Sequence, residues 1–225
     1  FYPKDEKSKT LYQKLFSIHF NKKQMKKALN TLMVYKHHYE EDIKVHREML
    51  TQILEHRIQK KQTNKIAFWV NKIDNGFLKF DSEYIQKSIR ILGSLLFEKY
   101  QALEKQGKTK EALAGYESIF ENEKYPKQTK AESAFAISLI MIQQNKSEDS
   151  FEWLSESLKL YDQSEIDKIS SSLLQLSKGQ RLLQNFKYST NIAENILQKY
   201  CEKNITEKQN ALEIIVENTL TAEKN

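Results

Sequence analysis

Apolar residues recur every three or four positions along almost the whole chain, the spacing that gathers them on one face of an α-helix. Leu11, Leu15 and Ile18 begin this pattern. Only five glycines and two prolines interrupt it among 225 residues. A strand-rich fold needs turn residues about every 8 to 12 positions, and this chain cannot supply them. The sequence therefore predicts an all-α fold.

Capping and breaking residues divide the pattern into about eleven helices. Thr129 with Glu132 and Thr206 with Gln209 have the spacing of capping boxes, and Asn21 followed by Gln24 resembles a capping pair. Short polar connections make successive helices antiparallel neighbours, so we expect one domain over residues 1–225. The expected helices cover about 8–20, 24–39, 41–60, 63–75, 81–106, 109–122, 129–144, 147–161, 164 to 179 or 185, 188–200 and 206–220.

The segment from Tyr100 to Tyr125 reads YQALEKQGKTKEALAGYESIFENEKY. It has a glycine in a turn (Gly107), then a small residue (Ala112) and an aromatic residue four positions later (Tyr116). In these positions it resembles a tetratricopeptide repeat. The resemblance implies an α-solenoid of stacked antiparallel helix hairpins, with about five repeats and a terminal helix.

Small residues mark the equivalent position in each predicted repeat: Ala28, Ala67, Ala112, Ser150 and roughly Asn191. The resulting intervals of 39, 45, 38 and about 41 residues exceed the family period of about 34. Tyr100 also stands where the family prefers a small residue. A related α/α array of another class therefore stays open. In the next repeat Asn145 replaces the turn glycine, because asparagine also tolerates left-handed backbone geometry.

The resemblance implies a protein or peptide partner bound in a concave groove, lined by the first helix of each hairpin. An apolar and aromatic centre with a basic end would suit a partner with an apolar anchor and acidic residues nearby. The alternative for Phe97, Phe135 and Leu139 is ordinary core packing between helices. The predicted partner-binding residues are Gln52, His56, Lys60, Phe97, Gln101, Glu104, Phe135, Leu139 and Ile142.

The net charge of +6 and the pI of about 9.1 make the chain mildly basic. Basic residues are densest in two stretches, 22–27 and 60–65, and the pattern favours solvated helix faces there. We therefore expect no nucleic-acid partner. Nucleic-acid binding stays as an alternative, and it requires both stretches to converge on one face with exposed aromatic residues.

Candidate chemical sites are few. His38, Asp42 and His46 are four residues apart, as metal ligands on one helical face would be, but the segment HHYEED predicts a turn that breaks this face. Cys201 has no partner motif, and the chain has no glycine-rich phosphate loop and no HExxH motif. We expect no catalytic residue, metal or cofactor. A regulatory domain of a larger enzyme remains a further alternative.

The location of the protein is not assigned by its sequence. No run approaches the roughly 18 apolar residues of a membrane span. The chain begins at Phe1 rather than Met, as a processed or trimmed piece of a longer protein would. The low-glycine composition rich in Lys, Asn and Ile is typical of an AT-rich genome, and we expect a bacterial protein. The bacterial cytoplasm and the cell envelope, where the chain would be periplasmic or membrane-anchored after processing, both stay open.

Overall fold

The computed structural model describes residues 5–161, 163–200 and 205–222. Within these ranges every regular element is helical, with eleven α-helices, one short 3-10 helix and no strand. The all-α prediction is confirmed. The sequence predicted one domain over residues 1–225, and two compact units can be distinguished within it, Phe1–Leu95 and Leu96–Asn225. The boundary between the two units falls inside helix α5.

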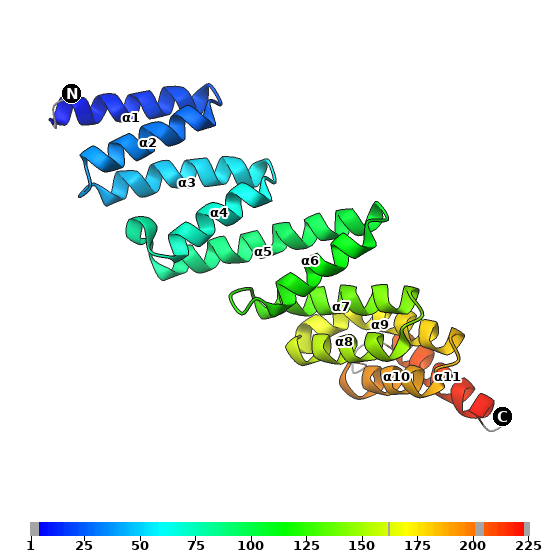
Figure 1. Cartoon of the computed structure of the whole chain (residues 1–225). Helices are drawn as coiled ribbons and strands as arrows, with labels where there is room; N and C mark the ends of the chain where they lie inside the picture. The colour runs from blue at the N-terminus through cyan, green and yellow to red at the C-terminus, as the bar shows by residue number, and fades with distance from the viewer. Residues whose placement is uncertain (1–4, 162, 201–204, 223–225) are drawn as a thin grey trace. The chain divides into compact units, whose positions relative to one another are not determined.

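In unit 1, successive helices run antiparallel and follow one another in chain order (Figure 1). Its core contains a large cluster of aliphatic and aromatic side chains in which Phe16, Leu32, Tyr35 and Ile53 are almost completely buried. Tyr84 and Ile85 near the start of α5 pack against this cluster. The elements are α1 (Glu6–Asn21), α2 (Met25–His38), α3 (Ile43–Gln59), α4 (Thr63–Asp74), the 3-10 helix η1 (Phe77–Lys79) and the first part of α5 (Ser82–Lys105).

Unit 2 begins with the second part of α5 and contains two core clusters. The first is centred on Ala112, Tyr116 and Ile137, and the second on Leu154, Leu173 and further residues of the last three helices. Helix α7 packs against both α6 and α8, and α10 packs against both α9 and α11. The helices are α6 (Thr109–Glu121), α7 (Lys127–Gln143), α8 (Ser147–Leu160), α9 (Gln163–Leu182), α10 (Phe186–Tyr200) and α11 (Ile205–Ala222).

One turn recurs in five helix hairpins, α1–α2, α3–α4, α5–α6, α7–α8 and α9–α10. In each, one residue adopts left-handed geometry and the N–H of the next residue donates to the carbonyl five residues back, as from Lys108 to Leu103 at 3.0 Å. This is the Schellman arrangement, which satisfies carbonyl groups at a helix end. The left-handed residues are Lys23, Lys61, Gly107, Asn145 and Gln184, so the intervals are 38, 46, 38 and 39 residues.

The turn fixes the register of the second helix of each hairpin. Five residues after the left-handed residue lies a side chain that is at most 1% exposed, and these residues are Ala28, Ile66, Ala112, Ser150 and Ser189. The predicted markers Ala67 and Asn191 were therefore wrong by one and two positions. A search for small residues alone could not find Ile66, because the equivalent site in that hairpin holds a large aliphatic side chain.

Two of the predicted capping interactions are absent from the structure, because the helices begin and end at other residues. Asn21 is the last residue of α1, while Gln24 accepts no capping bond and instead contacts the ring of His19. Helix α7 begins at Lys127, so Thr129 lies inside it rather than at its cap. Pro126 precedes the first helical residue, where its missing N–H does no harm. Asp81 does cap α5, since its carboxylate accepts from the N–H of Tyr84 at 2.8 Å.

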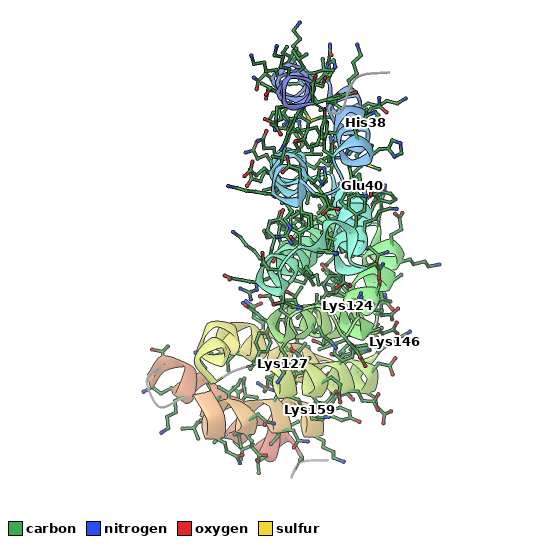
Figure 2. The ribbon with its side chains drawn as sticks, turned by 90° about the vertical axis from the view of Figure 1, so that its left-hand side faces the viewer. His38, Glu40, Lys124, Lys127, Lys146 and Lys159 are labelled. Atoms are coloured by element: carbon green, nitrogen blue, oxygen red, sulfur yellow. The ribbon has the colours of Figure 1, made fainter. Side chains whose placement is uncertain are left out.

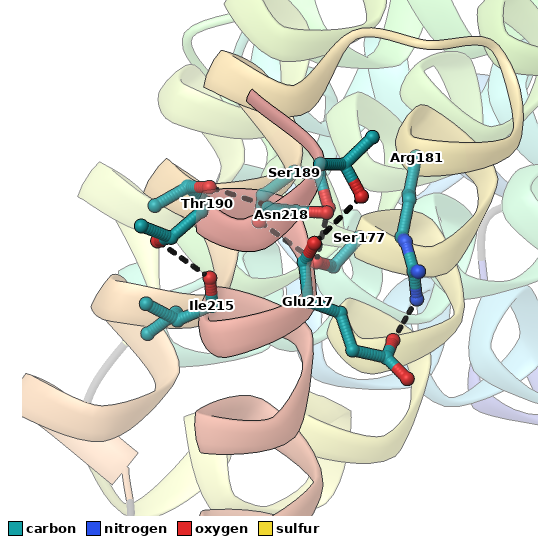
Figure 3. Close-up of polar contacts among 9 residues, drawn as sticks. Ser177, Arg181, Ser189, Thr190, Ile215, Glu217 and Asn218 are labelled. Atoms are coloured by element: carbon teal, nitrogen blue, oxygen red, sulfur yellow. Dashed lines mark hydrogen bonds and ion pairs between the residues drawn. The ribbon is translucent and has the colours of Figure 1, made fainter. Parts of the chain in front are cut away.

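Buried serines join the helices of unit 2 through backbone carbonyls. Ser150 in α8 donates to the carbonyl of Ser138 in α7, and Ser177 in α9 donates to that of Ser189 in α10, both at 2.8 Å. These contacts bring the paired backbones close together. Figure 3 shows Asn218 of α11 donating to the hydroxyl groups of Ser189 and Thr190, which ties the last helix to α10.

Candidate functional site

An open cavity of about 510 Å³ lies in unit 2, between the C-terminal half of α5 and the first part of α7. Tyr116 of α6 forms its inner wall and is completely buried, whereas Gln101 and Gln128 at the rim are exposed. Pockets of roughly 300–1,000 Å³ suit small molecules or a few peptide side chains. The lining residues are Phe97, Gln101, Glu104, Lys105, Tyr116, Gln128, Glu132, Phe135, Ala136, Leu139 and Tyr161.

Helical periodicity explains why these side chains share one wall. Phe97, Gln101 and Glu104 are spaced by four and three positions on α5. Gln128, Glu132 and Phe135 follow the same spacing on α7. Residues at these intervals lie on one face of a helix. The two faces meet across the cavity because α6 connects α5 to α7 and packs against α7.

The apolar part of the cavity wall is continuous with the core. Phe97 and Tyr116 have ring centroids 5.4 Å apart, and Phe97 packs against the first core cluster of unit 2. Phe135 and Leu139 pack against the second cluster while their remaining surface lines the cavity. All three residues are half-buried. Core packing and groove lining are therefore both properties of these side chains.

Two carboxylates lie in this apolar wall. The hydroxyl of Tyr116 donates to Oε2 of Glu104 at 3.0 Å, and the side-chain amide of Gln128 donates to Oε1 of Glu132 at 3.2 Å. Burial, together with the hydrogen bond to Glu104, raises the pKa of Tyr116 well above its usual value of 10. Tyr116 thus remains a protonated donor near neutral pH and fixes the position of the Glu104 carboxylate. The third charged group of the lining is the exposed Lys105.

The structure brings together five of the nine residues that the sequence predicted to bind a partner: Phe97, Gln101, Glu104, Phe135 and Leu139. Ile142 is not part of the lining. Its side chain lies toward Gly179 of α9, where an added Cβ would be 3.4 Å from Cδ1 of Ile142.

The lining residues Gln128 and Glu132 at the start of α7 were not predicted from the sequence. Extending the apolar stripe back from Phe135 by three and seven positions finds Glu132 and Gln128, but the predicted start at Thr129 left Gln128 outside the helix. Tyr161 follows α8 and reaches the cavity through tertiary packing, so no local pattern indicates it.

The remaining predicted residues, Gln52, His56 and Lys60, lie on α3 in unit 1. Gln52 and Lys60 are exposed, and His56 is half-buried. The ring of His56 meets that of Phe20 in α1 edge to face, with centroids 6.1 Å apart. This end of α3 is therefore beside the end of α1.

Charge is distributed unequally between the two units. Residues 1–95 contain 19 basic and 10 acidic side chains, whereas residues 96–225 contain 17 basic and 20 acidic ones. The formal net charges are thus +9 and −3. Positive charge is therefore concentrated in unit 1.

His38, Asp42 and His46, the candidate metal ligands of the sequence, each make other contacts in the structure. Asp42 accepts a hydrogen bond from Tyr35 at 2.6 Å and pairs with Lys9 at 2.8 Å. His46 is fully buried, and the ring of His38 stacks on that of Tyr12. No cluster of metal-ligating side chains occurs among the described residues. Cys201 lies outside the described ranges.

No described helix combines the length and apolar character that crossing a membrane requires. Comparison with known proteins found no family model that matches the chain and no curated protein with a matching sequence.

Proposed function

We propose that this chain is a tetratricopeptide-like repeat scaffold that binds a protein or peptide partner without catalysing a reaction. The single observation that carries the proposal is the open cavity between α5 and α7 in unit 2. Its lining combines an apolar wall with a few fixed polar groups, the composition typical of a recognition groove. The recurring hairpin turn supports a repeat architecture, since stacked hairpins of this kind share a core and leave one helix face of each pair available.

The binding role is favoured over catalysis by how the polar groups are held. Glu104 is fixed by Tyr116, whose raised pKa makes it a poor proton donor to a substrate and a good structural donor to a carboxylate. The apolar wall of Phe97, Phe135 and Leu139 would instead receive a large apolar side chain. Anchors of this type contribute most of the energy of a typical interface.

The charged side chains of the cavity favour a basic residue next to the partner's apolar anchor, whereas the sequence suggested an acidic one. The predicted basic end depended on Lys60, which lies in unit 1, while the cavity itself carries Glu104, Glu132 and one lysine. We propose that the segment bound here has a basic residue, rather than an acidic one, beside its apolar anchor.

A selection of displayed random peptides against the whole chain, followed by fluorescence anisotropy with the selected peptides, would test this function. Gln101→Trp would fill the mouth of the cavity from an exposed position on α5. Ser118→Trp adds the same side chain at an exposed position on α6 that does not line the cavity.

We expect the Gln101→Trp variant to bind at least about tenfold more weakly, which is 1.4 kcal/mol, and the Ser118→Trp variant to bind like the original chain. Equal affinity for all three would place peptide binding away from this cavity. If no peptide is enriched although the chain is folded, the proposed function itself is wrong.

A further inference from the structure

Two acid-free stretches of unit 1 carry most of its positive charge. No Asp or Glu occurs between Glu6 and Glu40, and this interval contains eight lysines. None occurs between Glu55 and Asp74, where there are four lysines and one arginine. Both stretches include a hairpin turn with the same local sequence, Lys-Lys-Gln, at 22–24 and 60–62.

The fold places these two turns at the same end of unit 1. Helices α1 and α3 run in the same direction, so the α1–α2 and α3–α4 turns lie at one end, as Figure 1 shows. The contact between the rings of Phe20 and His56 joins the ends of α1 and α3 directly. We call this surface the lysine edge, defined by Lys22, Lys23, Lys26, Lys27, Lys60, Lys61 and Lys65, all of which are exposed.

The opposite end of the same hairpins carries both signs of charge. The α2–α3 turn, where Figure 2 labels His38 and Glu40, contains Glu40, Glu41 and Asp42 in succession. Lys9 lies at this end and pairs with Asp42. The lysine edge differs because its lysines come from two stretches without an acidic residue.

Two residues of the lysine edge have left-handed backbone geometry, as the turn between the helices of each hairpin requires. Lys23 and Lys61 adopt φ values of 57° and 48°, whereas the equivalent positions in unit 2 hold Gly107, Asn145 and Gln184.

We infer that the lysine edge binds the phosphate backbone of a nucleic acid, independently of the groove in unit 2. Lysine is a flexible point charge that neutralises phosphates without reading base sequence. The half-buried rings of Phe20 and His56 lie between the two groups of lysines and offer a partial platform for bases. An anionic membrane is the competing partner, because Ile18 and Phe68, which are 50% and 55% exposed, lie four residues before Lys22 and three residues after Lys65. Titration with anionic vesicles separates the two.

The inference can be tested by fluorescence anisotropy titrations of the whole chain. The labelled ligands are 20-nucleotide single strands and 20-base-pair duplexes of mixed sequence, which show whether single-stranded or double-stranded nucleic acid is preferred. Phosphatidylserine-rich vesicles and polyglutamate serve as other polyanions. If seven lysines neutralise phosphates, the salt slope on a single strand should be about −5, a loss of roughly 1,000-fold between 50 and 200 mM salt.

The decisive variant changes Lys22, Lys26, Lys60 and Lys65 to Gln and leaves the left-handed residues in place. Its matched control changes four exposed lysines of unit 2, labelled in Figure 2, to Gln: Lys124, Lys127, Lys146 and Lys159. Both lose four positive charges. We expect the edge variant to bind at least about tenfold more weakly with a salt slope smaller by about 3, and the control to stay within about twofold.

Three results would overturn the inference. These are no nucleic-acid binding at 50 mM salt, an equal loss in both quadruple variants, or binding to the vesicles or to polyglutamate as tight as binding to nucleic acid. Circular dichroism of each variant would show that the helices are intact, as expected for exposed lysine positions.

Discussion

The ring of Tyr100 in α5 packs directly against the backbone of Gly115 in α6, in the space that a Cβ on residue 115 would occupy. In the tetratricopeptide pattern, which this segment resembles, a small residue stands at the position of Tyr100. Here the small residue is on the opposite helix, so the hairpin accommodates a large ring without separating its backbones further. Tyr100 also meets Tyr116 edge to face, with centroids 6.1 Å apart, beside the candidate groove.

Gly115→Ala should therefore destabilise unit 2 by about 1–3 kcal/mol, the usual cost of overpacking, despite the better helix propensity of alanine. Chemical denaturation followed by circular dichroism measures this change. Tyr100→Leu should recover part of the loss in the double variant, and Ser118→Ala at an exposed position of α6 should have little effect. A Gly115→Ala variant as stable as the original would show that the ring has room to move.

Lys23→Gly and Lys61→Gly should each stabilise unit 1 by up to about 1 kcal/mol, since glycine reaches left-handed geometry without a Cβ clash. Gly107→Ala is the reciprocal change and should destabilise unit 2 by a similar amount, because Gly107 has a φ of 77°. Thermal unfolding of the three variants would test both the expected stabilisation by glycine and the expected destabilisation by alanine. Destabilisation by either lysine-to-glycine change would contradict the account of strain at the lysine edge.

His46 should make unit 1 less stable in mild acid. Both ring nitrogens are buried without a hydrogen-bond partner, and burial lowers the pKa of His46 below its usual value of 6.5, while Asp42 raises it and Lys36 lowers it further. Below pH 6.5 the unfolded chain takes up a proton that the folded unit resists. Stability is therefore complete above this pH and falls as the pH drops below it.

Melting temperatures between pH 7.5 and 5 would reveal this dependence. His46→Leu should remove the fall between pH 6.5 and 5 without loss of stability at pH 7.5, because an unpaired buried polar group disappears. His37→Leu changes an exposed histidine on α2 and should keep the fall. A His46→Leu variant with the original pH profile would assign the effect to another group.

Asn218→Ala should weaken the packing of α11 and lower the free energy of unfolding of unit 2 by about 1–2 kcal/mol. Asn218 is 2% exposed, and its amide donates to Ser189 at 2.9 Å and Thr190 at 3.1 Å. Figure 3 shows the neighbouring pair of Arg181 with Glu217, which joins α9 to the same helix. Thr219→Ala, exposed and bonded within its own helix, is the control. Equal stability of the two variants would show that α11 depends on its apolar contacts alone.

Local chemistry explains which parts of the fold could be predicted from the sequence. Gly107 and Asn145 were expected in left-handed turns and are found there, with φ values of 77° and 59°. Lys23, Lys61 and Gln184 occupy the same position and could not be predicted, because their side chains do not favour this geometry. The five recurrent turns are specified by the hydrogen-bonded arrangement of two helices rather than by one residue type.

The candidate site shows the same division. Phe97, Gln101 and Glu104 follow from helical spacing within α5, which the sequence indicates clearly. Tyr161 reaches the cavity only through packing of the segment after α8. The two lysine-rich stretches of unit 1 were visible in the sequence. Their position at one end of the unit depends on the parallel direction of α1 and α3, which is a property of the fold.

The proposed function depends on the cavity between α5 and α7 holding a polypeptide partner. Hydrogen exchange of the whole chain, with and without a peptide selected for binding, would locate the bound peptide. We expect added protection at residues 97–105 and 128–139, the two segments that form the walls, with little change in α8 and α10. Protection confined to other helices, with these two segments unchanged, would contradict it.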